Sequence, residues 1–181
     1  MKFRKKIIPF RHCLCCGAAD FAADTFKSFQ CAACGFKFFF NPAPATIAII
    51  SDETSRLLVT TRKSEPAKGT LDLPGGFCDP GETAEECLNR EIREELNINI
   101  RHSTYIGSEP NIYAFEGVVY KTLDLVFLCR VESFTGIIAR DDVASIHFMK
   151  KSELDPEKFG LLSNKNIIGK IIACEGNFAV L

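Results

Sequence analysis

Glutamate side chains are concentrated in one short stretch of the chain, Leu73 to Leu96, which reads LPGGFCDPGETAEECLNREIREEL. The chain as a whole is almost neutral, with 22 Lys+Arg against 23 Asp+Glu. Carboxylates are hard oxygen ligands, and Mg²⁺ favours them together with retained waters and substrate phosphates. The stretch is therefore a candidate metal site, and the alternative is a charged helix face exposed to solvent.

The positions of these glutamates on a helix distinguish the two interpretations. Residues 83–96 carry a helical period, because apolar residues recur every four positions: Ala84, Leu88, Ile92 and Leu96. At about 100° per residue from Ala84, this stripe covers roughly 0° to 120°, whereas Glu94, Glu91 and Glu95 fall near about 280°, 340° and 20°. The three carboxylates therefore run from the solvent face into the edge of the buried stripe. Because crowded, partly buried carboxylates repel one another, the pattern favours a bound divalent cation.

Two features beside the glutamates fit such a site. Arg90 follows Glu82 by eight positions, and an ion pair between them would close the loop onto the helix. We count both among the site residues. The turn at 74–76, Pro-Gly-Gly, allows a close approach in which a backbone carbonyl joins the metal shell.

Cysteines form a second candidate metal site near the start of the chain. Two C-x-x-C-G motifs supply four thiolates, from Cys13, Cys16, Cys31 and Cys34. This spacing predicts a closed tetrahedral Zn²⁺ site with a structural role. Cys15 could replace Cys13, and His12 is a weaker substitute. The remaining cysteines have no paired spacing and are expected to be packing residues: Cys78, Cys87, Cys129 and Cys174.

Composition limits the classes of protein that remain. The 181 residues, 46% of them apolar, suit one domain with a small appendage, and a net charge of −1 gives no overall field for nucleic acid. We therefore expect no nucleic-acid partner. The basic start has no apolar run longer than two residues and nothing approaches a membrane span, so we expect a cytoplasmic protein without membrane contact.

The elements that would position these residues fall into two parts. The segment NPAP at 41–44 predicts a boundary, because proline interrupts regular structure. A zinc ribbon over 1–40 precedes it. Beyond it we expect a helix over 83–96, a second helix near the end of the chain, and several strands. The strands are predicted at 45–50, 56–62, 70–73, 98–107, 117–132 and 145–150. The mixed order favours a layered α/β domain with a mixed sheet.

The arrangement around the glutamates resembles the motif of the Nudix hydrolases, G-x(5)-E-x(7)-R-E-U-x-E-E-x-G-U, where U is a bulky aliphatic residue. Its positions are occupied here by Gly76, Glu82, Arg90, Glu91, Ile92, Glu94, Glu95, Asn97 and Ile98. One position departs from the motif, since Asn97 stands in place of glycine. That position is expected to end the helix in a left-handed conformation, which asparagine tolerates best after glycine.

The resemblance implies a three-layer α/β/α Nudix sandwich over 43–181 and hydrolysis of a nucleoside diphosphate linked to another group, dependent on Mg²⁺ or Mn²⁺. It assigns metal binding to Glu91, Glu94 and Glu95, with the carbonyl of Gly75 beside them. One of the glutamates would also orient or deprotonate the attacking water. The metal ions would neutralise the pyrophosphate and stabilise the departing oxygen.

Two further residues are candidates for the same site. Some family members add an acid from a loop before the last core strand. Asp142 is the better candidate here and Asp141 the alternative, and a solvated acidic turn would explain both equally well. Arg62 ends a predicted strand near the expected phosphate position, where arginines are more often only solvated.

The substrate is the least determined feature. A zinc ribbon ahead of a Nudix domain also resembles the NADH pyrophosphatases and relatives acting on ADP-ribose or FAD. Their Ser-Gln-Pro-Trp motif is replaced by GSEPNIYAFEG, in which Tyr113 or Phe115 could stack on a base or simply pack. We expect cleavage of ADP-ribose, NADH or FAD with release of AMP. The alternatives are a nucleoside triphosphate pyrophosphohydrolase and a non-catalytic ligand sensor. A homodimer is the family-level expectation.

Overall fold

The structure is a computed structural model that describes residues 10–174. Residues 1–9 of the predicted zinc ribbon lie outside the described residues, as do 175–181 of the predicted hydrolase domain. None of the helices within 10–174 combines the length and the apolar character needed to cross a membrane.

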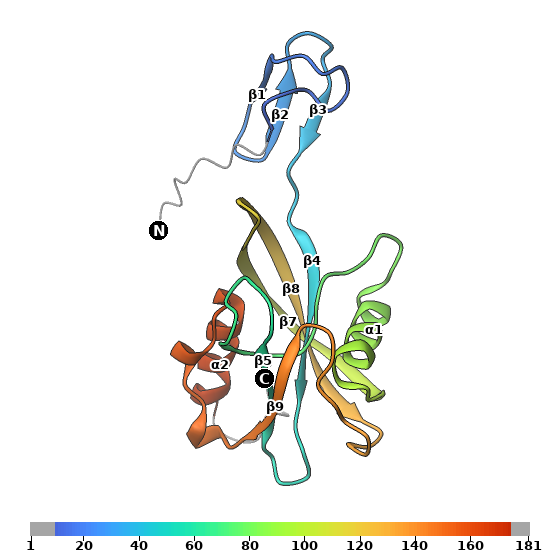
Figure 1. The fold of residues 1–181 in the computed structure, drawn as a ribbon, viewed down its shortest axis with the longest axis vertical. Coiled ribbons are helices and arrows are strands. Elements are labelled where there is room, and N and C mark those ends of the chain that lie inside the picture. The colour runs from blue at the N-terminus through green and yellow to red at the C-terminus, as the bar shows by residue number, and fades with distance from the viewer. Residues whose placement is uncertain (1–9, 175–181) are drawn as a thin grey trace.

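A small antiparallel sheet forms the N-terminal part. It consists of β1 (Phe21–Ala23), β2 (Ser28–Cys31) and β3 (Lys37–Phe39) in that order. Its core combines Cys13 and Cys31 with phenylalanine side chains, among them Phe21 and Phe29. Figure 1 shows this sheet at one end of the molecule, joined to the larger part by the stretch that leads into β4 (Ala43–Ile50). So few apolar residues bury little surface, and the four-cysteine cluster at this core could hold a metal ion.

The larger part contains two three-stranded sheets. In the first, β4 runs parallel to β8 (Val118–Val131), which pairs antiparallel with β7 (Ile100–Phe115). In the second, β5 (Leu57–Arg62) lies between β6 (Leu71–Asp72) and β9 (Val143–Met149), all antiparallel. The pairing Ser51↔Leu57 joins the end of β4 to the start of β5. The predicted mixed sheet is confirmed.

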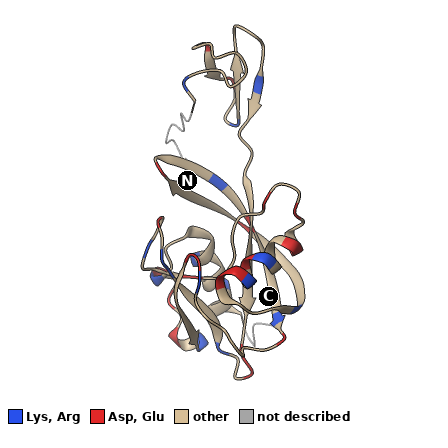
Figure 2. Cartoon of the chain, turned by 45° about the vertical axis from the view of Figure 1, so that its right-hand side comes forward, with Lys and Arg blue, Asp and Glu red and all other residues tan. Residues whose placement is uncertain are grey.

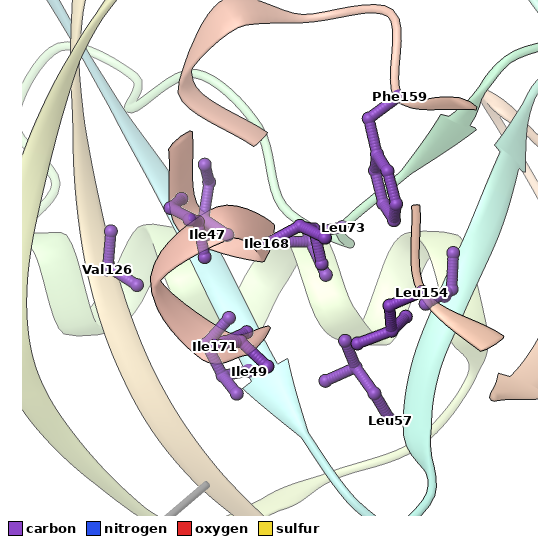
Figure 3. Packing of buried hydrophobic residues seen from close by; sticks show 11 residues of the cluster. Ile47, Ile49, Leu57, Leu73, Val126, Leu154, Phe159, Ile168 and Ile171 are labelled. Atoms are coloured by element: carbon purple, nitrogen blue, oxygen red, sulfur yellow. The ribbon is translucent and has the colours of Figure 1, made fainter. Parts of the chain in front are cut away.

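Helices cover the sheets on opposite sides. The helices are α1 (Ala84–Leu96) and α2 (Leu162–Ala173), and two short 3₁₀ turns precede α2 at Lys151–Glu153 and Pro156–Lys158. Alternate residues of β4 point in opposite directions, so Ile47 and Ile49 pack with α2, whereas Ala48 and Ile50 pack with α1. Figure 3 shows the α2 side of this core, with Ile168 and Ile171 facing β4. The α/β/α layering is therefore confirmed.

Two local expectations were wrong. The segment that follows Gly107, which lies outside the predicted strands at 98–107 and 117–132, is the second half of β7, because its residues pair in register with β8 as far as Phe115↔Val118. A tight turn at Glu116 and Gly117, both with positive φ, closes this hairpin. In addition, Pro44 does not interrupt regular structure but lies inside β4. This strand is at the edge of its sheet, where a missing amide donor is tolerated.

Candidate active site and metal centres

Helix α1 carries the glutamates and is fixed at both ends. At its start, the hydroxyl of Thr83 accepts a hydrogen bond from the backbone of Glu86, whose carboxylate accepts one from the backbone of Thr83. At its end, Asn97 adopts the predicted left-handed conformation, with φ 56° and ψ 35°. These caps determine where the helix begins and ends. They therefore set which of its faces turns inward.

The glycine turn lies against β4 and leaves no room for side chains. The carbonyls of Pro74 and Gly76 accept hydrogen bonds from the backbone of Ala48 and Thr46, at 2.9 and 2.8 Å. A Cβ on Gly75, whose φ is +139°, would lie 2.1 Å from the Thr46 carbonyl oxygen. A Cβ on Gly76 would lie 2.5 Å from the carboxylate carbon of Glu91. Gly75 therefore requires glycine for its approach to the strand, whereas a side chain at Gly76 would displace the carboxylate of Glu91.

Arg90 joins the loop to the helix. Its Nε and Nη2 donate to the two carboxylate oxygens of Glu82 at 2.6 and 2.9 Å, and Nη2 also donates to the Phe77 carbonyl at 3.0 Å. Its Nη1 donates to Glu91 at 2.7 Å and to Glu94 at 3.2 Å. These hydrogen bonds from Arg90 lower the pKa of Glu82 to about 2. The expected ion pair is present, and it also holds two of the candidate metal ligands.

Burial separates the three glutamates. Glu95 is only 7% exposed and accepts a hydrogen bond from the Gly75 N–H at 3.0 Å. Burial raises the pKa of Glu95 well above its ordinary value and also raises the pKa of Glu91. The side chain of Glu94, in contrast, is 51% exposed. The acidic and basic residues along α1 are visible in Figure 2. The buried carboxylates need positive charge if they are to stay ionised.

A cleft of about 290 Å³ runs beside these groups. Its lining includes five predicted residues from the motif region: Gly75, Arg90, Glu91, Glu94 and Glu95. It also includes Arg62, Tyr113, Asp141 and Asp142. Glu82 and Phe115 are not part of the lining, and the Phe115 ring centre lies 6.4 Å from that of Tyr113. The structure thus gathers most of the predicted residues, from distant segments, around one cleft.

Arg62 is engaged inside the protein. It forms an ion pair with Asp72, and its Nε donates to the Pro66 carbonyl at 2.7 Å. Asp72 is 7% exposed and also accepts hydrogen bonds from the backbone of Leu73, at 3.0 Å, and from Asn164. A buried carboxylate of this kind requires its cationic partner. Arg62 therefore stabilises one wall of the cleft, whatever it contributes to binding.

The carboxylates of the cleft fit a loosely held hydrated cation. Within residues 10–174, three or more potential ligand atoms lie within 4.8 Å of one another only at the four cysteines, so no three carboxylates of the cleft are that close together. Mg²⁺ commonly takes one or two carboxylates and fills its other positions with waters and substrate phosphates. Among the described residues, the Gly75 carbonyl accepts none of the hydrogen bonds that hold the turn, which leaves it available as a further ligand.

The four predicted cysteines fit a zinc ion. The Sγ atoms of Cys13 and Cys34 are 3.7 Å apart, as are those of Cys16 and Cys31. Four sulfurs at about 2.3 Å from a tetrahedral Zn²⁺ would be separated by about 3.8 Å, so these distances match. Cys15 is exposed and outside the cluster, and only its backbone N–H reaches the sulfur of Cys13, at 3.4 Å. The structure therefore favours Cys13 over Cys15.

Sequence reasoning missed a group of buried polar residues on the α2 side of the cleft. Asn111, Thr122, Asp124 and Asn164 are each at most 4% exposed, and all four line the cleft. A signal was present in the segment TLDLVFL, where Asp124 occupies an inward position of an apolar strand. Its alternation with Val126 could have identified Asp124 as a buried polar residue.

Comparison with known families gives one match over most of the chain. The NUDIX domain matches residues 41–168. A curated relative, the NAD-capped RNA hydrolase NudC of Pseudomonas fluorescens, is 32% identical over 99 residues, which are 55% of this chain and 35% of that protein. The match thus spans about a third of the relative's length.

Solved structures agree with this match. A NUDIX hydrolase from Nitrosomonas europaea has a TM-score of 0.63 at 16% identity and covers 91% of both chains, a likeness that concerns the fold alone. A MutT NUDIX hydrolase from Burkholderia pseudomallei has a TM-score of 0.55 at 25% identity, covering 64% of this chain and 88% of that one.

Proposed function

Because this chain belongs to the Nudix family, we propose that it hydrolyses the pyrophosphate bond of a nucleoside diphosphate linked to a second group. This proposal rests on the row of carboxylates from Glu91, Glu94 and Glu95 along one cleft, two of which are buried enough that they need positive charge nearby to stay ionised. Carboxylates can act on a negatively charged substrate only when metal ions neutralise the charge of the carboxylates and of the substrate.

In this proposal the cleft residues bind the metal ion and orient the reacting groups. Glu91, Glu94 and Glu95, with Asp142 and the Gly75 carbonyl, hold Mg²⁺ or Mn²⁺. When bound, the metal supplies charge neutralisation and a more acidic water. A glutamate carboxylate accepts the proton of the attacking water. The charge of Arg90 is already paired with neighbouring carboxylates. Its hydrogen bonds to them therefore keep these carboxylates in position.

The substrate class is proposed as an adenine-containing dinucleotide such as ADP-ribose, NADH or FAD, cleaved to release AMP. Tyr113 lines the cleft, and its ring meets that of Phe77 edge-on at 5.1 Å, so an aromatic surface is available for a base or a second ring. Phe115 would act only through contact with Tyr113. The relative's name adds NAD-capped RNA to the candidates. The expectation that nucleic acid is not a partner therefore loses its support.

The N-terminal 40 residues are proposed as a separate zinc ribbon ahead of a hydrolase domain over 43–181. Four thiolates close the Zn²⁺ coordination and leave no position for water, so this metal stabilises structure. A homodimer stays a prediction, to be tested by light scattering of the purified chain.

A substrate panel tests the proposal. The purified chain, with Mg²⁺ or Mn²⁺, would be offered NADH, ADP-ribose, FAD, a short NAD-capped RNA and the nucleoside triphosphates, with products separated by chromatography. We expect AMP, or a 5′-monophosphate RNA, from at least one linked diphosphate. Cleavage of triphosphates alone, with release of inorganic pyrophosphate, would favour the sanitising function. A chain that binds these compounds without turnover would be a sensor.

A further inference from the structure

The buried polar residues on the α2 side of the cleft form a group separate from the glutamates. We call Asn111, Thr122, Asp124 and Asn164 the polar pocket. Asn111 on β7 pairs in register with Thr122 on β8, and Asp124 follows two positions later on the same face. Asn164 comes from α2. Strand and helix therefore bring these four side chains together where an apolar core would otherwise continue, as it does at Val126.

The amide of Asn164 has a fixed orientation. Its Nδ2 donates a hydrogen bond to Asp72, the partner of Arg62. The reversed amide would place its oxygen against the negatively charged carboxylate, so the orientation is determined by charge. Its Oδ1 is consequently directed elsewhere, and within the described part of the chain this buried oxygen has no hydrogen-bond partner. Buried acceptors of this kind are rare in folded proteins.

Asn111 repeats the arrangement beside a second carboxylate. Its amide lies beside Asp124, and Thr122 donates to that carboxylate at 2.6 Å. The Oδ1 of Asn111 is again buried and without a partner among the described residues. Two amides beside carboxylates therefore each leave a hydrogen-bond acceptor unused beside the same cleft.

The chemistry of these acceptors restricts what can satisfy them. Asp124 is buried, and the nearby Glu109 is paired with Lys170. A phosphate would offer these acceptors no hydrogen-bond donor at neutral pH. A primary amine or amide attached to a planar ring supplies two N–H donors without negative charge, which matches two unused acceptors.

We propose that the polar pocket binds the amino group of a ring in the substrate, through the amide oxygens of Asn111 and Asn164. This inference rests on the proposed function, because it assigns the part of a nucleotide substrate that the cleft recognises. Two sources carry this chemistry in a pyridine dinucleotide: the exocyclic amine of adenine and the carboxamide of nicotinamide. Either would lie on the α2 side of the cleft while the diphosphate lies at α1.

Binding of mononucleotides to the full chain separates the two sources without requiring turnover. Isothermal titration would compare AMP with IMP, and nicotinamide mononucleotide with its 3-acetylpyridine analogue, which lacks the amide N–H groups, all with Mg²⁺ present. If adenine is the source, IMP binds at least ~10-fold more weakly than AMP, because a carbonyl oxygen then meets unpaired acceptors. If nicotinamide is the source, the acetylpyridine analogue shows that loss instead.

Substitutions test whether the preference for the amino-bearing ligand comes from the polar pocket. In Asn111→Leu and Asn164→Leu the preference for the amino-bearing ligand should fall below ~3-fold. Asn166→Ala is the matched control, since Asn166 also lies on α2 but donates to Glu109 at 3.1 Å and does not line the cleft. The control should keep the preference of the unsubstituted chain. Loss of the preference in the control as well would assign it to general destabilisation of α2 and overturn the proposal.

The outcomes for the unsubstituted chain decide the proposal even if a variant fails to fold. Equal affinities within 2-fold in both pairs, or no detectable binding of AMP and nicotinamide mononucleotide, would overturn it. A clear preference in a chain that hydrolyses nothing would retain the polar pocket and reject the proposed function. Hydrolysis without any preference within the two ligand pairs would retain the proposed function and reject the polar pocket.

Discussion

Replacing Gly76 by alanine tests whether the turn positions Glu91 for chemistry. The added Cβ would lie 2.5 Å from Cδ and 2.6 Å from both carboxylate oxygens of Glu91, whereas ordinary contact begins at 3.4 Å. The carboxylate must therefore move by about 0.9 Å. Because the crowded atoms belong to the end of a flexible side chain, we expect the fold to persist at a cost of about 1 kcal/mol.

The displacement should affect turnover far more than folding. A shift of about 1 Å in a positioned group can cost on the order of 10²-fold in rate, so we expect kcat of Gly76→Ala to fall by about that factor. Steady-state rates of product release, with thermal unfolding of the same samples, measure both quantities. Gly169→Ala is the matched control, since a Cβ there meets no atom within 4 Å. A kcat within 3-fold of the unsubstituted chain would refute the reasoning.

Three further predictions concern metals, charge and the cleft wall. Elemental analysis should find about one zinc per chain, and replacing both Cys31 and Cys34 by serine should abolish zinc binding. Full zinc occupancy in that variant would show that these cysteines are not the ligands. Burial raises the pKa of Glu95, so the folded metal-free chain binds this proton more tightly than the unfolded chain and loses stability as pH rises from 4.5 through the raised pKa. Glu95→Gln should flatten this slope in urea unfolding and be the more stable form at pH 7, and an unchanged slope would contradict the burial argument. Arg62→Met should cost about 3–5 kcal/mol by leaving Asp72 buried and unpaired, and adding Asp72→Asn should recover part of the loss.

The sequence alone predicts those features of the fold whose signal is local. The four-residue apolar spacing from Ala84 to Leu96 predicts α1 almost to its ends, because helix periodicity and caps depend on neighbours along the chain. The paired C-x-x-C motifs predict the cysteine cluster for the same reason. The left-handed Asn97 was likewise expected from its place in the motif and has φ 56°. The helix and its end are set by residues a few positions apart, whereas the cluster joins two local motifs whose sulfurs meet across 15 and 21 positions of the chain.

Features that depend on distant partners were not predictable in the same way. The segment after Gly107 contains glycine, proline and asparagine, which favour a loop, yet pairing with β8 makes it a strand. Arg62 was considered for phosphate binding, but its partner Asp72 comes from β6 and its setting is visible only in the fold. The polar pocket requires β7, β8 and α2 together, so no single stretch of sequence contains it.

The glutamates of α1 are proposed to support metal-dependent hydrolysis in the cleft. The most direct measurement is kcat of Glu94→Gln and Glu95→Gln, with saturating Mg²⁺, on a compound that the unsubstituted chain cleaves. We expect folded variants whose kcat is at least ~10²-fold lower, and loss of the unsubstituted chain's activity when EDTA removes the metal. Near-normal turnover in both variants, or activity that persists in EDTA, would contradict it.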